Sequence, residues 1–140
     1  MTTIAYDKKR GEIAVDSRCT SDGVLCSNNV TKFVHLNGGG MGFFTGKWSE
    51  VLMLKEQVID GGKPDPEQLE EATYIEVRNG KVTEFDGPVG ERINRSSAWG
   101  SGSEYAVGAM EAGATAAQAV KIAAKYDLAT GGKIHVFKVK

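Results

Sequence analysis

The sequence predicts an α+β protein in which hairpins form two antiparallel sheets and helices add further layers. Two observations support this fold class. Short β-rich runs occur in pairs around turn residues, and segments with apolar residues at helical spacing lie between and after those pairs. The chain has 140 residues and a formal net charge of −1, which suits one domain over residues 1–140 with a substantial core.

Three turns organise the predicted strands. Lys8-Lys9-Arg10-Gly11 is a polar turn, and Asn79-Gly80 is the strongest short hairpin signal in the chain. Asn37-Gly38-Gly39-Gly40 precedes a strand and not a helix, so we interpret it as a tight turn and not as a phosphate loop. The strands paired in this way are Thr2–Asp7 with Glu12–Asp16, Asn29–Leu36 with Met41–Thr45, and Thr73–Arg78 with Lys81–Phe85.

Helices are predicted from apolar spacing and from start and stop signals. A capping box of Thr115 and Gln118 begins the helix Ala116–Tyr126, and Gly61-Gly62 ends the helix Lys47–Ile59. The other predicted elements are a short helix over Asp65–Ala72, an Ala-rich helix from Ser103 to Gly113, and strands over Ser97–Gly100 and Ile134–Val139.

Composition excludes several classes of function. The near-neutral charge and the lack of a basic run argue against nucleic acid or an anionic membrane as a partner. No apolar run is long enough to span a bilayer and no export signal begins the chain, so we expect a cytoplasmic protein. Cys19 and Cys26 are then expected to be free thiols. His35 and His135 are isolated in the sequence, so we expect neither a metal nor another cofactor.

Thr2 is the first candidate functional residue. A small residue after the initiator methionine normally leads to removal of that methionine, so we expect the mature chain to begin at Thr2. Thr2 would then carry a hydroxyl nucleophile and a free α-amine whose ordinary pKa lies close enough to neutral for general-base chemistry. A threonine paired with its own N-terminal amine is a known activated nucleophile. Many proteins begin Met-Thr, so the remaining motifs decide the interpretation.

Four segments carry motifs in a consistent order along nearly the whole chain. They are Thr2-Thr3-Ile4, Val15-Asp16-Ser17-Arg18-Cys19-Thr20, Asn29-Val30-Thr31-Lys32 and Tyr126-Asp127-Leu128-Ala129-Thr130-Gly131-Gly132. Gly100-Ser101-Gly102-Ser103 adds a fifth segment before a helix. Together they resemble the proteasome β-subunit and HslV family of N-terminal-nucleophile hydrolases.

The resemblance implies a fold and a catalytic apparatus. The fold is a four-layer αββα sandwich of two antiparallel sheets flanked by helices. Thr2 would be the nucleophile, Lys32 the cation beside its hydroxyl, and Asp16 the partner of Lys32. The backbone N–H of Gly46 would serve the oxyanion hole. Ser101, Asp127 and Thr130 match the family's polar cluster around the threonine amine.

The resemblance also implies substrates and partners. Polypeptides would bind as extended strands, with Thr20 and Gly46 pairing to the substrate backbone. The pocket before the scissile bond would favour small or medium apolar side chains, because Phe44 would form its floor; its other lining residues would be Cys19, Val30 and Trp48. A 140-residue domain cannot enclose a chamber, so we expect a homo-oligomeric ring, stacked in pairs, that an unfoldase ATPase could serve.

Ordinary structural roles remain open for several of these residues. Asp16 could open an Asx turn, Lys32 could be an edge-strand lysine, Gly46 could be a strand-to-helix turn, and Ser101 could be a helix N-cap. Two other functions also remain: a catalytically silent ring-forming scaffold and a small-molecule N-terminal-nucleophile amidase.

The chain departs from the family pattern at the family's second helix. Only a short segment from Gly61 to Ala72 is left for that helix, which bears on ring contacts and ATPase docking. In this respect the chain resembles the short HslV-like proteins encoded by phages.

Overall fold

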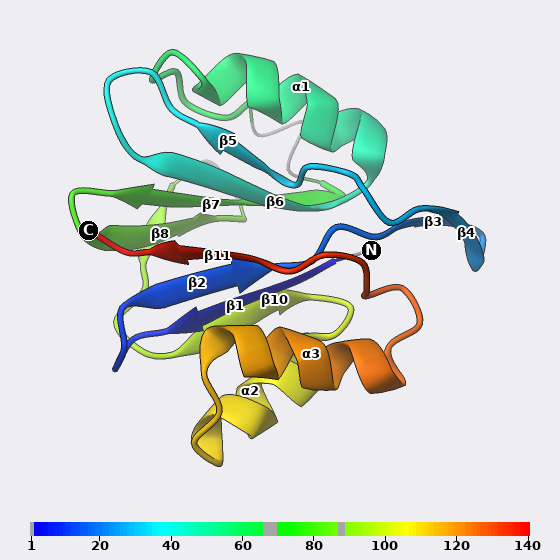
Figure 1. Cartoon of the computed structure of the whole chain (residues 1–140). Helices are drawn as coiled ribbons and strands as arrows, with labels where there is room; N and C mark the ends of the chain where they lie inside the picture. Colours follow the sequence, from blue (N-terminus) through cyan, green and yellow to red (C-terminus); the bar gives the residue numbers. More distant parts are fainter. Residues whose placement is uncertain (1, 66–69, 87–88) are drawn as a thin grey trace. The chain divides into compact units, whose positions relative to one another are not determined.

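The computed structural model describes residues 2–65, 70–86 and 89–140 (Figure 1). Contacts divide the chain into two compact units, Met1–Thr31 with Arg95–Lys138, and Lys32–Asn94 with Val139–Lys140. Each unit contains an antiparallel sheet with helical cover, as the predicted α+β class requires. None of the helices in the described ranges is long and apolar enough to cross a membrane. The assignment of residues 1–140 to one domain stays a prediction.

The first unit is built on a four-stranded antiparallel sheet. Its strands, in spatial order, are β10 (Ser97–Gly100), β1 (Thr3–Asp7), β2 (Glu12–Val15) and β11 (His135–Lys138). Two helices, α2 (Ser103–Glu111) and α3 (Ala116–Tyr126), pack against each other and against this sheet. A separate hairpin consists of β3 (Cys19–Ser21) and β4 (Val24–Ser27).

Small side chains fill the space between this sheet and its helices. Ala5 and Ala14 lie opposite each other on β1 and β2 and point into the core under α2 and α3. The helices contribute side chains of similar size to the same cluster: Ala106, Ala116, Ala119, Val120 and Ala123. Because strand side chains alternate between faces, Thr3 and Ala5 share the helix-covered face of β1, whereas Ile4 lies on the other.

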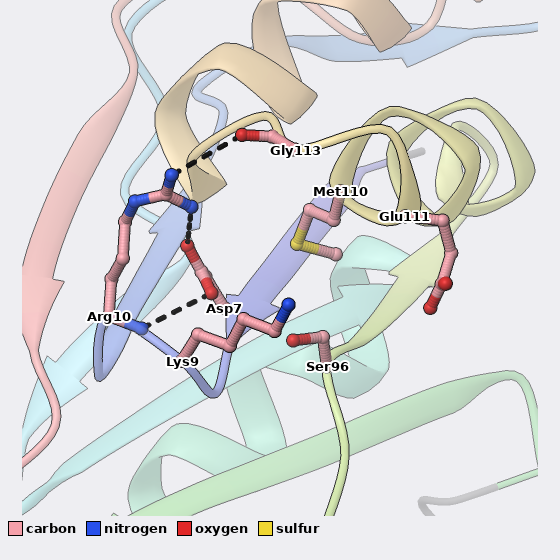
Figure 2. A pocket seen from close by; sticks show the side chains of 7 residues that line it. All are labelled: Asp7, Lys9, Arg10, Ser96, Met110, Glu111 and Gly113. Carbon is pink, nitrogen blue, oxygen red and sulfur yellow. Dashed lines mark hydrogen bonds and ion pairs between the residues drawn. The ribbon is translucent and has the colours of Figure 1, made fainter.

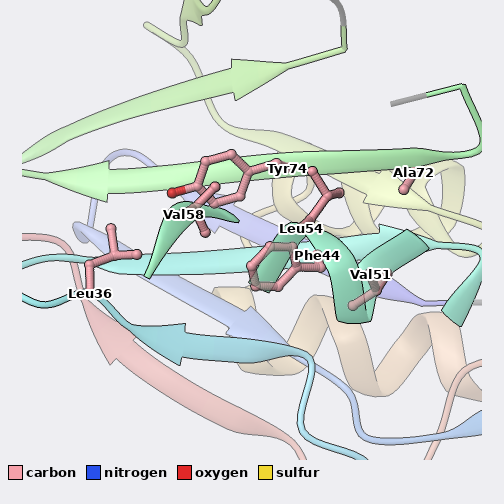
Figure 3. Close-up of a cluster of buried hydrophobic side chains, with 7 residues drawn as sticks. All are labelled: Leu36, Phe44, Val51, Leu54, Val58, Ala72 and Tyr74. Carbon is pink, nitrogen blue, oxygen red and sulfur yellow. The ribbon is translucent and has the colours of Figure 1, made fainter. Parts of the chain in front are cut away.

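The second unit contains a five-stranded sheet and one helix. The strand order is β5 (Phe33–His35), β6 (Met41–Gly46), β7 (Ala72–Arg78), β8 (Lys81–Phe85) and β9 (Glu91–Arg92), with all neighbours antiparallel. Helix α1 (Trp48–Val58) packs on β6 and β7. Its buried residues Val51, Leu54 and Val58 recur at helical spacing and meet the sheet in the core that Figure 3 shows.

An aromatic row crosses three strands of this second core. Phe44 stacks on Tyr74 with a centroid separation of 5.3 Å, and Tyr74 stacks on Phe85 at 5.5 Å. The register pairs these residues directly across β6, β7 and β8. Such aromatic cross-strand pairs stabilise a sheet beyond the area they bury.

Most predicted elements occur where the sequence placed them. The helix Ala116–Tyr126 and the strand Lys81–Phe85 have the predicted bounds, and the Thr115–Gln118 capping box is present. Asn79 and Gly80 both have positive φ, as a type I′ hairpin turn requires. Helix α1 is one residue shorter at each end than predicted.

Three expectations need correction or lie outside the described ranges. The strand predicted over Asn29–Leu36 was too long, because only Phe33–His35 pairs with β6. The hairpin of β3 and β4 was missed, although Asp22-Gly23 supplies its positive-φ turn. Half of the predicted helix Asp65–Ala72, residues 66–69, lies outside the described residues, and Ala72 already begins β7.

The capping box gives a test of helix stability in the first unit. The Thr115 side chain accepts from the Gln118 N–H at 3.2 Å, and the Gln118 side chain accepts from the Thr115 N–H at 2.9 Å. We expect Thr115→Ala to lower the free energy of unfolding by about 1 kcal/mol, because one N–H loses its acceptor. Thr115→Ser keeps the acceptor and should stay close to wild type in chemical denaturation. Equal stability of the Ala and Ser variants would contradict a role for the cap.

Candidate active site

Thr2 directly precedes β1, the strand that pairs with β10 on one side and with β2 on the other. It is 3% exposed. Thr3 pairs with Gly100 on one side, and the Ile4–Val15 pair continues to Thr3 and Asp16 on the other. Extending both registers by one residue places Ser101 and Ser17 opposite Thr2. The candidate nucleophile therefore sits among residues of the predicted motifs.

The carboxyl group of Asp16 joins two segments that are far apart in the sequence. One of its oxygens accepts from the N–H of Thr3 at 3.2 Å, and the other accepts from the N–H of Gly131 at 3.0 Å. The Asp16 N–H donates in turn to the Thr3 carbonyl at 3.3 Å. Asp16 has no exposed surface, so these bonds act without competition from solvent. We call this arrangement the Asp16 clamp.

A chain of hydroxyl groups ends at Asp127. Ser101 and Thr130 both donate to the same Asp127 oxygen, Oδ2, at 2.5 and 2.6 Å. The Thr130 hydroxyl also bonds to the Thr3 hydroxyl at 2.7 Å. The other Asp127 oxygen accepts from the Ala129 N–H at 3.1 Å. We call the connected side chains of Thr3, Thr130, Asp127 and Ser101 the hydroxyl chain.

The hydrogen bonds of Asp127 stabilise its ionised form. Burial raises the pKa of this carboxyl group, but the hydrogen bonds from Ser101, Thr130 and Ala129 outweigh that effect and lower the pKa below its ordinary value. Asp127 is also the C-cap of α3, where the helix dipole disfavours an acid. The three donors compensate for that location by stabilising the carboxylate form of Asp127 beside Ser101.

Close backbone approach brings the loops of this unit together. A side chain at Gly102 would meet the Thr3 hydroxyl oxygen at 2.1 Å. A side chain at Gly131 would meet the Arg18 guanidinium at 2.5 Å. That guanidinium donates to the Leu128 carbonyl at 2.9 Å and to the Asn28 side chain at 2.8 Å. Arg18 therefore ties the loop after β2 to the loop after α3.

Two of the predicted catalytic residues, Lys32 and Gly46, belong to the second unit. Lys32 is 3% exposed, and its carbonyl accepts from the Phe44 N–H at 3.0 Å. Gly46 ends β6 with φ of 120°, and a side chain there would meet the Glu71 carbonyl oxygen at 2.1 Å. A side chain at Gly46 is therefore excluded by the backbone at the start of β7, and glycine is needed here whether or not this residue contacts a substrate.

Comparison of three-dimensional structures identifies the fold. No protein-family model and no curated protein matches the sequence. BPH from Thiobacillus denitrificans, in complex with epoxomicin, matches with a TM-score of 0.76 and 17% identity over 100% of both chains. HslV from Trypanosoma brucei matches with a TM-score of 0.75 and 18% identity, over 97% of this chain and 99% of that chain.

The chain has the fold of HslV. A second BPH structure agrees, with a TM-score of 0.73 and 17% identity over 99% of this chain and 98% of that chain. Because the matches extend over the whole chain, they confirm the predicted α+β fold of the N-terminal-nucleophile hydrolases. At this level of identity they establish the fold and leave the chemistry to be argued from the residues.

Within the HslV fold, the residues predicted to bind substrate have varied environments. Cys19 and Thr20 are half-buried on β3, and Val30 donates its N–H to the Ser17 carbonyl at 3.0 Å. Phe44 is fully buried in the core under α1. Trp48, also half-buried, has the Lys55 ammonium 5.2 Å from its ring centroid. Their contacts with a substrate stay a prediction.

Three features of this site were not predicted from the sequence. They are the side chains of Thr3 and Arg18 and the absence of a side chain at Gly102, although all three residues lie within the motifs named above. The repeated Thr-Thr and Gly-Ser-Gly patterns were the available signals. They did not show that the hydroxyl of Thr3 meets Thr130, which is 127 positions away in the sequence.

A hollow of about 370 Å³ lies at the opposite end of β1 from Thr2 (Figure 2). Arg10 bonds there to the Asp7 carboxylate at 2.8 Å and to the Gly113 carbonyl at 3.3 Å. The other residues that line the hollow are Lys9, Ser96, Met110 and Glu111. The strand length places this hollow about 16 Å from Thr2, so it is separate from the candidate active site. The described residues include no group of three side chains suited to a metal ion.

Gly102 provides a direct test of the close packing in the site. Its φ of −94° is open to alanine, so a substitution acts through the added methyl group and not through the backbone. We expect Gly102→Ala to lower the free energy of unfolding by about 1–3 kcal/mol, because the methyl group would overlap the buried Thr3 hydroxyl.

Gly108→Ala is the matched control, because this glycine lies in α2 and an added Cβ would meet no atom within 4 Å. It should raise the free energy of unfolding by about 0.5–1 kcal/mol through helix propensity. Denaturation curves in which the two variants behave alike would contradict the packing described around Thr3.

Proposed function

We propose that this chain is a threonine-type endopeptidase whose nucleophile is the Thr2 hydroxyl, made available when Met1 is removed. The observation that carries the proposal is that the Asp16 clamp and the hydroxyl chain meet at Thr3, the residue directly after Thr2. The likeness to BPH and HslV supports the same proposal at the level of the fold.

The proposed reaction uses the two groups of Thr2 in sequence. The α-amine takes the hydroxyl proton while the oxygen attacks a peptide carbonyl carbon. The proton then passes to the leaving nitrogen as the peptide C–N bond breaks, which leaves an ester on Thr2. A water molecule, activated by the same amine, hydrolyses the ester and restores the hydroxyl.

The surrounding residues would hold the amine in place for these transfers. Ser101 donates its own proton to Asp127, so its oxygen keeps lone pairs that can accept from the Thr2 amine. Asp127 supplies a negative charge that favours the protonated amine after attack. Asp16 fixes the Thr3 N–H, and thereby the peptide group that follows the nucleophile.

Lys32 and Gly46 complete the proposed catalytic group. A buried ammonium at Lys32 would favour the Thr2 alkoxide electrostatically, with Asp16 as its counter-charge, and the Gly46 N–H would donate to the oxyanion. The burial of Lys32 supports this role over that of an ordinary edge-strand lysine, because an exposed edge lysine would remain in water.

The proposed substrates are polypeptides bound in extended form, and the proposed assembly is a homo-oligomeric ring in the cytoplasm, stacked in pairs. An open peptidase groove would endanger other proteins, and ring closure removes that hazard. An unfoldase ATPase would then deliver substrates. The shortened segment between α1 and β7 would leave less surface for such a partner than the larger family members offer.

The N-terminal nucleophile can be tested by mass and by substitution. We expect native mass spectrometry to show an oligomer of at least six subunits, each lacking Met1, and to show a complex after incubation with epoxomicin. Thr2→Ala should abolish peptide hydrolysis and epoxomicin binding while the assembly persists, because the hydroxyl is removed without change to the strand.

Thr2→Ser is the control, because it keeps a hydroxyl and an amine on the same residue and should retain measurable turnover. Hydrolysis that continues with Met1 in place, or in Thr2→Ala, would exclude the N-terminal nucleophile. An assembled wild-type ring that hydrolyses no peptide would indicate the silent scaffold.

The role of Lys32 gives a second test of the mechanism. Lys32→Met keeps most of the side-chain volume but removes the cation, so we expect turnover to fall by at least about 10²-fold with the fold retained. Lys81→Met makes the same change at an exposed lysine of the same unit and should leave turnover unchanged. Undiminished turnover in Lys32→Met would show that Lys32 is structural.

A further inference from the structure

Thr3 makes three polar contacts with residues of the proposed site. Its N–H donates to the Asp16 carboxylate, and its carbonyl accepts from the Asp16 N–H. Its hydroxyl bonds to Thr130 at 2.7 Å. The backbone contacts belong to the Asp16 clamp, whereas the hydroxyl contact is a property of the side chain and needs a separate explanation.

The direction of the Thr3–Thr130 hydrogen bond follows from counting protons. Thr130 has one hydroxyl proton, and it donates that proton to the Asp127 carboxylate at 2.6 Å. Thr130 must therefore accept in its contact with Thr3, and the Thr3 hydroxyl must be the donor. Thr3 and Thr130 both have no exposed surface, so solvent does not compete for either hydroxyl.

The proton order extends along the hydroxyl chain to the region of the nucleophile. Thr3 donates to Thr130, and Thr130 donates to Asp127, as Ser101 does from the other side. A hydroxyl that accepts one hydrogen bond becomes a stronger donor in the next. Thr3 thereby strengthens the Thr130–Asp127 bond and fixes the carboxylate that orients Ser101 beside Thr2.

We propose that the Thr3 hydroxyl is a positioning group that fixes the proton order of the hydroxyl chain serving the Thr2 amine. This inference rests on the proposed function, since it assigns Thr3 to the same reaction. Thr3 acts through Thr130 and does not touch the substrate. Its side chain lies on the helix-covered face of β1, so its loss should affect turnover and not substrate binding.

A double-mutant cycle between Thr3 and Thr130 tests this inference. Thr3→Val should lower kcat about tenfold with KM unchanged, the factor expected for one net hydrogen bond. Thr3→Ser keeps the donor and should restore kcat to near the wild-type value. In the Thr130→Val background, Thr3→Val should cause no further loss, because the acceptor through which Thr3 acts is already absent.

Controls separate this inference from the proposed function and from misfolding. Thr83→Val makes the same chemical change on β8 of the other unit and should leave kcat unchanged. Thr3→Ala replaces Thr3→Val if the larger side chain prevents folding by crowding Thr130. Two results would overturn the role of Thr3 even if Thr2→Ala is inactive. One is full turnover in Thr3→Val or in its replacement Thr3→Ala, and the other is an equal loss of kcat from this substitution in the wild-type and Thr130→Val backgrounds. Hydrolysis that survives Thr2→Ala would overturn the proposed function and this inference with it.

Discussion

The buried carboxyl group of Asp16 constrains the ends of several strands and loops at once. Its two oxygens satisfy the N–H groups of Thr3 and Gly131, which come from opposite ends of the sequence. A buried N–H without an acceptor is costly, so each of these bonds stabilises the local backbone geometry. The neighbouring hydroxyl of Ser17 extends this connection, because it lies within hydrogen-bonding distance of two carbonyl oxygens, those of Asn28 at 2.9 Å and Lys133 at 2.7 Å, and can donate its one proton to either. The position of Thr2 depends on this network, since Thr3 is its direct neighbour in the chain.

Small residues make this constraint compatible with a packed core. Gly102 allows the Thr3 hydroxyl to reach Thr130, and the alanines of α3 allow that helix to lie close to β1 and β2. The cost is an acid at the C-terminal end of α3, which the hydrogen bonds to Asp127 offset. These small residues thus allow the hydroxyl chain from Thr3 to Asp127 to form inside a packed core.

Local signals in the sequence predicted the local structure well. The Asn79-Gly80 turn and the capping box at Thr115 are encoded by adjacent residues, so their conformations could be derived without the fold. The site required more. The family resemblance named Asp16 and Asp127, but sequence spacing does not show which backbone groups they bind. The proton direction from Thr3 to Thr130 became visible only when residues separated by 127 positions were placed in contact.

The most direct test of the account is amide hydrogen exchange in Asp16→Ala, measured by mass spectrometry against the wild type. If Asp16 holds the site together, exchange should accelerate in both residues 2–7 and residues 129–132, because Thr3 and Gly131 lose a shared acceptor. Helix α3, residues 116–126, should keep its protection and serve as an internal reference. Unchanged exchange in both segments would contradict the claim that Asp16 positions the candidate nucleophile.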